Sequence, residues 1–273
     1  MAEINRRSLM LTTGFGMLAA AMRLPEAWAQ PGPVHPLPAA PPQTYLFRDE
    51  FDGPAGSAPD PAKWAVARAR ESMKDPTFWE RPENVGQYRD DRQNVFVDGK
   101  SNLVLRAAKD GDTYYSGKVQ SRWRGGIGHT WEARIKLNCL TAGAWPAWWM
   151  GNDDDGEIDV FEWYGNGNWP SATTVHTRSN GAEWATHQIS MDSAWHTWRC
   201  RWDTEGIRFW RDYTEGASPY FSVPAHSIAD WPFNNPGYQV FSVLNLAVAG
   251  SGGGDPRPGS YPAEMLVDWI RVF

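Results

Sequence analysis

Short strand-like runs separated by turn residues make up the chain from about residue 45 onward. Gly, Pro, Asn and Asp interrupt these runs, and long helical periodicity and internal repeats are absent. Short strands joined by tight turns bury their apolar faces by stacking sheets. The pattern therefore predicts an all-β fold, a sandwich of two antiparallel sheets, with clear strands at residues 103–107, 130–137, 195–202, 207–213, 238–247 and 265–273.

The first 44 residues have a different character. Paired arginines in residues 5–9 precede an apolar stretch at 9–22, and Ala-Trp-Ala at 27–29 offers a signal-peptidase site. Paired arginines are typical of twin-arginine export, and the apolar stretch is too short and weak for a stable membrane span. An uncleaved anchor is the alternative. We expect a secreted or cell-envelope protein with a signal peptide at 1–29, a Pro/Ala-rich linker at 30–44 and one domain at 45–273.

Residues 157–162, Glu-Ile-Asp-Val-Phe-Glu, place three acids in a run that otherwise predicts a buried strand. On a regular strand Glu157 and Asp159 share one face, and the apolar residues between them face a core. Glu162 then falls on the wrong face. One extra residue at Phe161, a β-bulge, would return Glu162 to the face of the other two acids.

Two carboxyl groups on opposite sides of a glycosidic bond are what sugar hydrolysis requires. A calcium site and a simple charged strand face are alternative interpretations. The preceding residues favour catalysis, since Trp-Pro-Ala-Trp-Trp-Met at 145–150 and a polar turn at 151–156 predict a hairpin that sets flat rings beside the acids. By strand parity, Trp145 and Trp149 share one face and Trp148 and Met150 share the other, so one pair would lie beside the acids and the other in a core; the alternative is that both pairs are core.

The acidic strand resembles the active-site strand of glycoside hydrolase family 16, the retaining endo-glycanases that include laminarinases, agarases and lichenases. The bulged spacing is similar to that of the laminarinase and agarase branches. The resemblance covers about residues 45–273 and implies a concanavalin-like jelly roll with a cleft across its concave sheet. Other segments are also similar to strands of this family, and they lie at 47–53, 94–105, 115–117, 132–134 and 266–272.

The resemblance also implies roles for individual residues. Glu157 would be the nucleophile and Glu162 the acid/base of a double displacement. Asp159, between them, is expected to hydrogen-bond Glu157 and help to keep it anionic, within a set of acids that titrate together. Trp145 and Trp149 are expected in the cleft. Other candidate sugar contacts, for which structural roles are the alternative, are His176, Asn94, Arg92, Trp231 and Asn245.

No cofactor is implied, but several relatives bind a structural calcium ion. The matching positions here are the Asp268 carboxylate and the backbone carbonyls of Glu50 and Gly99. The alternative for Asp268 is a surface carboxylate paired with Arg271 or a lysine. The two cysteines, Cys139 and Cys200, either form a disulfide or remain buried thiols.

The net charge of −6 argues against nucleic acid or an anionic membrane as a partner. The 17 Trp residues suit a carbohydrate cleft, although some must serve the core. We therefore expect a monomeric, secreted, retaining endo-glycanase that acts on a polysaccharide, with β-1,3-glucan as the first candidate. The alternatives are an agarase or galactanase, a transglycosylase, and a lectin-like module without turnover.

Overall fold

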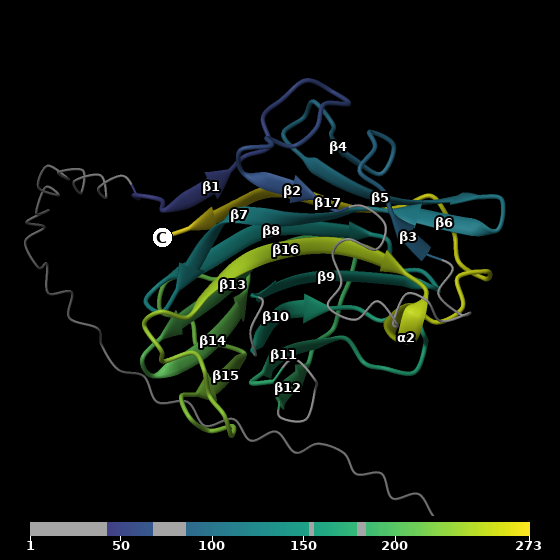
Figure 1. Ribbon diagram of the computed structural model, residues 1–273. Helices are drawn as coiled ribbons and strands as arrows, with labels where there is room; N and C mark the ends of the chain where they lie inside the picture. The colour runs from purple at the N-terminus through teal and green to yellow at the C-terminus, as the bar shows by residue number, and fades with distance from the viewer. Residues whose placement is uncertain (1–42, 68–85, 153–155, 179–183) are drawn as a thin grey trace, which may run out of the picture. The chain divides into compact units, whose positions relative to one another are not determined.

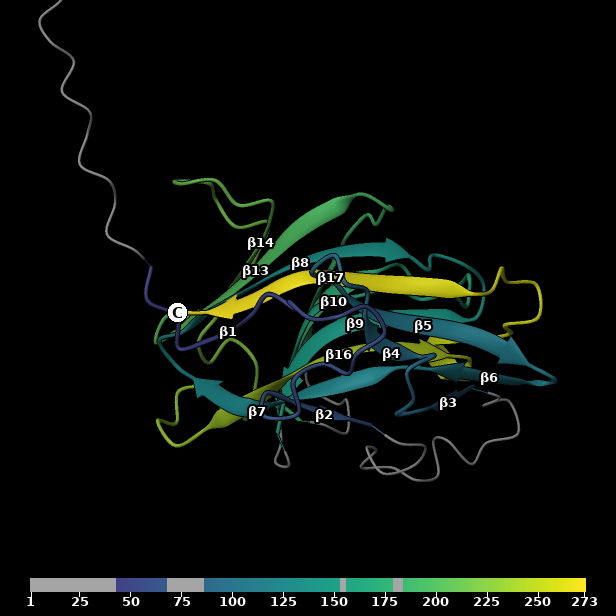
Figure 2. The same ribbon diagram turned by 90° about the horizontal axis from the view of Figure 1, so that it is seen from above.

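Two β-sheets form the protein in the computed structural model, which describes residues 43–67, 86–152, 156–178 and 184–273. The predicted signal peptide, the linker up to residue 42 and the predicted turn at 153–155 lie outside these residues. The sheets stack face to face, as Figures 1 and 2 show. The all-β sandwich predicted from the turn-punctuated runs is therefore confirmed, and each of the six clearest predicted runs coincides with a strand.

The first sheet has ten strands and follows the order β15, β14, β13, β8, β17, β5, β6, β3, with β1 added beside β17 and β4 beside β5. Every pairing in it is antiparallel except β3 with β6, which is parallel. Its strands are β1 (Phe47–Asp49), β3 (Gly86–Tyr88), β4 (Val95–Val97), β5 (Leu103–Asp110), β6 (Thr113–Ser116), β8 (Thr130–Asn138), β13 (Trp195–Asp203), β14 (Gly206–Arg211), β15 (Phe221–Pro224) and β17 (Ala263–Val272).

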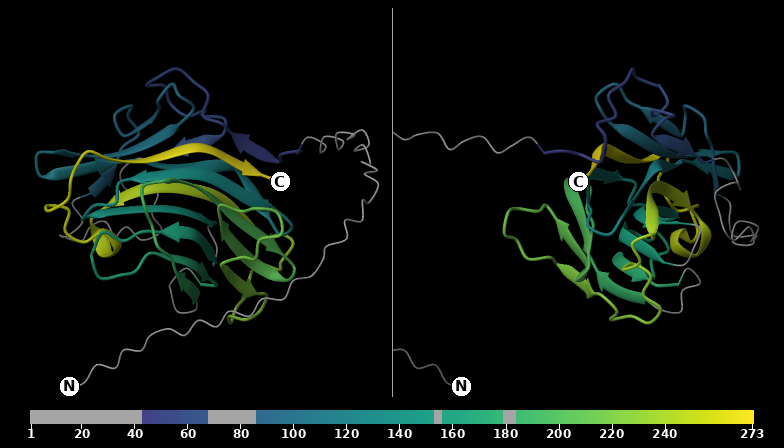
Figure 3. Two further views of the ribbon diagram at one scale, coloured as in Figure 1. Left: turned by 180° about the vertical axis from the view of Figure 1, so that it is seen from behind. Right: turned by 60° about the vertical axis from the view of Figure 1, so that its left-hand side comes forward.

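The second sheet has seven antiparallel strands in the order β12, β11, β10, β9, β16, β7, β2. It carries the acidic strand, β10, between β9 and β11. Its strands are β2 (Trp64–Val66), β7 (Lys118–Gly126), β9 (Ala144–Gly151), β10 (Glu157–Glu162), β11 (Ala172–His176), β12 (Trp184–Gln188) and β16 (Gln239–Val248). Among the described residues the helical element is one turn, α2 (Gly250–Gly253), which contacts β9 and is the yellow helix of Figure 3.

Apolar side chains from the inner faces of both sheets fill the space between them. Phe161 of β10 packs against Trp198 of β13, with ring centres 5.0 Å apart, and so joins the two sheets. Trp131 and Trp202 stack at 5.9 Å in the same core. Part of the tryptophan content therefore serves packing, since burying such large rings contributes strongly to stability.

Both cysteines lie in this core as free thiols, which decides between the two alternatives left open by the sequence. Burial raises the pKa of each thiol far above its usual value, so neither is prepared for reaction. In the part of the chain that the structure describes, no helix has the length and apolar character required to cross a membrane.

Candidate active site

A β-bulge in β10 brings the three acids onto one face of the seven-stranded sheet. Asp159 pairs with Trp149 of β9, but the next paired residue, Phe161, is opposite Trp148, so β10 contains one residue more than its neighbour. Both residues of the bulge are fully buried. Because two successive side chains enter the core, Glu162 returns to the face of Glu157 and Asp159, as the sequence predicted. We call this surface the acidic face.

Glu162 accepts a hydrogen bond on each carboxyl oxygen. The indole Nε1–H of Trp145 donates to Oε1 at 3.0 Å. The hydroxyl of Tyr164 donates to Oε2 at 2.6 Å. Two donors fix the plane of the carboxyl group and stabilise its anionic form.

The ring of Trp145 is itself held by the backbone of α2. A Cβ atom added to Gly252 would lie only 2.3 Å from Cδ2 of Trp145 and 2.6 Å from Cε3. The absence of a side chain at Gly252 therefore lets α2 approach the indole closely. The same turn is anchored to the segment after β10, because the backbone N–H of Asn166 donates to the carbonyl of Gly252 at 3.1 Å.

Glu157 and Asp159 form a second group with His176 of β11. The two carboxyl groups lie close enough that each affects the pKa of the other. Nε2 of His176 lies 3.1 Å from Oδ2 of Asp159, in contact but without the alignment of a hydrogen bond. The donor atoms of the three side chains lie within 4.8 Å of one another, and they form the one cluster of metal-ligating groups found among the described residues.

Burial raises the pKa of all three acids. For Glu157 the charge of Asp159 raises the pKa further, whereas the charges of His176 and Lys118 oppose the rise. The expected help from Asp159 in keeping Glu157 anionic is not observed, because the charge of Asp159 raises the pKa of Glu157. The reason is that adjacent ionised carboxylates repel each other, so the three groups share protons as a coupled set.

Strand parity places Trp145 and Trp149 correctly on the acidic face, where both are partly exposed, while Trp148 and Met150 are fully buried. The indole N–H of Trp149 donates to Oδ1 of Asn245 at 2.8 Å. Asn245 is thus brought to the acidic face, but its carbonyl oxygen orients an aromatic ring.

Lys118 of β7 contributes a cation to the same face. Its side chain is buried, and Nζ lies 5.1 Å from the ring centre of Trp149. Burial lowers the pKa of Lys118 to about 8, against the charge of Glu157, which raises it. The lysine is therefore, with His176, one of the two nearby charges that favour ionised Glu157.

Three predicted sugar contacts, Asn94, Arg92 and Trp231, take part in structural interactions. Asn94 is 2 % exposed, and its amide nitrogen donates to the carbonyls of Arg106 and Tyr115 at 2.8 and 2.9 Å, so it ties strands together and is not available to a ligand. Arg92 is exposed in the turn before β4, in the other sheet, and donates to the carbonyl of Asp90. Trp231 packs on Phe233 with ring centres 4.9 Å apart, in the loop before β16. For Asn94 the structural alternative is the one observed, and sugar binding by Arg92 and Trp231 stays a prediction.

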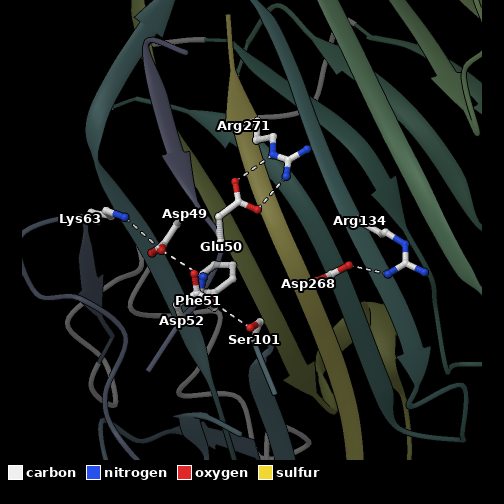
Figure 4. A network of polar contacts seen from close by, with 9 residues as sticks. All are labelled: Asp49, Glu50, Phe51, Asp52, Lys63, Ser101, Arg134, Asp268 and Arg271. Carbon is white, nitrogen blue, oxygen red and sulfur yellow. Dashed lines mark hydrogen bonds and ion pairs between the residues drawn. The ribbon is translucent and has the colours of Figure 1, made fainter. Parts of the chain in front are cut away.

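The one side chain among the proposed calcium ligands, Asp268, forms an ion pair with Arg134 rather than with the expected Arg271. Figure 4 shows the Asp268 carboxylate turned toward Arg134 and the Glu50 carboxylate turned toward Arg271. Gly99 lies in a turn with φ +77°, packed against Ala55. A hard cation requires six to eight oxygens, and the single carboxylate offered here is already neutralised by a guanidinium group. The one carboxylate expected to bind calcium is therefore already paired with an arginine, and calcium binding stays an untested prediction.

Two residues of the site were missed by the sequence reasoning. Tyr164 lies two positions after Glu162, so strand parity places it on the same side and could have identified it. Lys118 occupies a strand that pairs with β16, far from β10 in sequence, and its approach to Glu157 follows only from the sheet order.

Comparison with known proteins agrees with this geometry. The family profile described as "Glycosyl hydrolases family 16" matches residues 84–250. The protein named glucan endo-1,3-beta-glucosidase A1 of Niallia circulans is 28% identical over 86% of this chain, and the match spans 38% of that protein's length.

Two solved structures extend the comparison. A β-1,3-glucanase from Mycobacterium marinum is 77% identical with a TM-score of 0.81, over 85% of this chain and 100% of that one. A Mycobacterium tuberculosis protein described as an immunostimulatory antigen and pseudo β-1,3-glucanase is 62% identical with a TM-score of 0.79, over 84% and 98% of the two chains. By its fold, its bulged acidic strand and these matches, the chain belongs to glycosyl hydrolase family 16.

Proposed function

We propose that the protein is a retaining endo-β-1,3-glucanase. The observation that carries the proposal is the bulge in β10, which sets Glu157, Asp159 and Glu162 on one face of one strand. In the proposed double displacement, the Glu157 carboxylate attacks the anomeric carbon while Glu162 protonates the leaving oxygen. Glu162 then removes a proton from the incoming water, which releases the sugar from Glu157.

The charges around the acids support this division of roles. Burial raises the pKa of Glu157, as it does that of Glu162, but the charges of His176 and Lys118 oppose the rise and so favour the anion that a nucleophile requires. Burial raises the pKa of Glu162, which favours the protonated form that a general acid requires. Asp159 sits between them on the same face and is close enough to affect the pKa of Glu157. A pair of carboxyl groups with different surroundings is the usual basis of acid and nucleophile roles.

The preference for β-1,3-glucan is supported by two relatives, one named a glucan endo-1,3-β-glucosidase and one a β-1,3-glucanase. Fold alone does not determine the substrate, so agarose and other galactans remain the runner-up substrates.

A second candidate is glucan binding without hydrolysis. It is favoured by the two donors that occupy both oxygens of Glu162, which stabilise the anion and compete with protonation of a leaving group. A relative 62% identical is described as a pseudo β-1,3-glucanase. If this candidate holds, the acidic face binds sugar but the chain releases no reducing ends.

The deciding experiment is release of reducing ends from laminarin, lichenan, agarose and a galactan by wild type, Glu157→Gln, Glu162→Gln and Glu264→Gln. Glu264 is the control, since it forms an ion pair with Arg106 on the ten-stranded sheet. We expect wild type and the control to act mainly on laminarin and to give products of retained configuration by NMR. Each glutamine variant of the acidic face should lose at least about 1,000-fold in kcat while keeping its circular dichroism spectrum. Substantial turnover by either variant would overturn the assignment.

We further propose that the mature protein is exported by the twin-arginine route and acts outside the cytoplasmic membrane as a monomer. This rests on the arginine pair and cleavage-site pattern of residues 1–29. N-terminal sequencing of the mature protein should begin near Gln30, and light scattering should give the mass of one chain. Retention in the cytoplasm, or a dimer mass, would contradict these two points respectively.

A further inference from the structure

Two exposed tryptophans lie close to the acidic face. Within the described residues, the exposed large apolar side chains are Leu46, Trp169 and Trp184, and the two indoles are 49 % and 53 % exposed. A single exposed apolar residue is ordinary on a protein surface. The informative observation is that each of these indoles is connected to a different acid of the site through one intervening ring.

Trp184 continues a row of side chains that begins at Glu157. In the sheet, Glu157 pairs with His176 of β11, and His176 pairs with Trp184 of β12. Directly paired residues of antiparallel strands point to the same face, so all three belong to the acidic face. The rings of His176 and Trp184 have centres 6.3 Å apart. Trp184 therefore stands at the edge strand, two strands away from Glu157.

Trp169 lies in the loop from β10 to β11, beyond the other end of the acidic strand. Its ring is nearly perpendicular to that of Tyr164, with centres 5.3 Å apart. Tyr164 donates its hydroxyl hydrogen to Glu162. The backbone N–H of Trp169 donates to Oδ1 of Asn166 at 3.0 Å, which fixes the start of the indole side chain. The edge-on contact with Tyr164 leaves much of the indole in water.

We propose that Trp169 and Trp184 are outer sugar-binding platforms, one near Glu162 and one near Glu157, each of which stacks on a pyranose ring of the glucan. The proposal rests on the function proposed above for its substrate class. A β-linked glucose ring has an apolar face of axial C–H bonds, which packs on an indole and removes apolar area from water. The two platforms would make the binding site longer than the pair of sugars at the scissile bond, and so would favour polymers over short oligosaccharides.

The test measures binding without turnover, by calorimetry with laminarihexaose and laminaribiose, in the Glu157→Gln background. Trp169→Ala and Trp184→Ala are compared with Trp195→Ala, a partly exposed tryptophan on the ten-stranded sheet, 4.7 Å from the Arg134 guanidinium. We expect each platform variant to bind laminarihexaose about tenfold more weakly, with little change for laminaribiose. Trp195→Ala should bind as the parent does, and Trp169→Tyr and Trp184→Tyr should recover most of the affinity.

The outcomes separate the two proposals. If the parent binds laminarihexaose and both alanine variants bind it equally tightly, the platforms are wrong and the proposed glucan specificity survives. If the parent binds no β-1,3-oligosaccharide at all, the proposed substrate fails and the platforms fail with it. Equal loss for laminarihexaose and laminaribiose would also contradict the inference, because it would place the indoles at the scissile bond. Melting curves of all variants establish that they are folded.

Discussion

At the residue scale, Lys118 has an unusual position, since a lysine is seldom as deeply buried as this one. Desolvation lowers the pKa of Lys118, and the negative charge of Glu157 partly opposes this lowering. The benefit is reciprocal, because the ammonium group lowers the pKa of Glu157. A buried cation near a carboxylate is a means of keeping a nucleophile ionised in a site where burial and two other acids oppose ionisation.

Replacing Lys118 with Met tests this role through the pH profile of kcat/KM. Removing the cation raises the pKa of Glu157, so the acidic limb of the profile should move to higher pH, with a severalfold loss of activity on that limb. The two proteins should converge above about pH 8, where wild-type Lys118 is itself becoming neutral. Lys109→Met, at an exposed position, is the control. A uniform loss at every pH would show that Lys118 only supports the fold.

At the element scale, the bulge explains what the sequence could and could not predict. Side chains alternate between the two faces of a regular strand, which would put Glu162 on the face opposite Glu157 and Asp159. This mismatch was enough to predict one inserted residue. The same rule sorted Trp145 and Trp149 from the core residues beside them. It cannot reveal partners on distant strands. Asn94 was predicted to contact sugar, but its amide bonds two backbone carbonyls in β5 and β6. The sequence could not reveal these partners, because long-range strand pairing brings them together.

The α2 turn gives a prediction at the same scale. Gly252→Ala would place a methyl group against the Trp145 ring and displace the indole from Glu162. Displacements of about 1 Å in a site can lower kcat about 100-fold, while the overpacking costs about 1–3 kcal/mol of stability. We expect kcat to fall by about 10- to 100-fold with little change in KM. Gly237→Ala, where the nearest atom would be 3.6 Å away, is the matched control. Activity equal to that of the control would show that Trp145 can move without consequence.

At the scale of the whole molecule, the sandwich holds a group of buried acids that lowers the stability of the fold. The core between the sheets is apolar and closely packed, yet β10 holds three acids whose pKa values are all raised by burial. A raised pKa in the folded state means that the folded protein binds protons more tightly than the unfolded chain does. The acids therefore cost stability at neutral pH, as catalytic groups often do.

Asp159→Asn measures this cost. Asp159 is 2 % exposed and its folded-state pKa lies well above the usual value. Its unfavourable contribution is absent below the unfolded-state pKa of about 3.9 and grows as the pH rises through the folded-state pKa. The amide variant should therefore melt a few degrees above wild type at pH 7 to 8, since about 1 kcal/mol corresponds to about 2–4 °C for a chain of this size. The difference should shrink toward pH 4, and the exposed control Asp110→Asn should show no such trend. An amide variant that melts below wild type at pH 7, by a difference that disappears on acidification, would mean that ionised Asp159 stabilises the fold through its contact with His176.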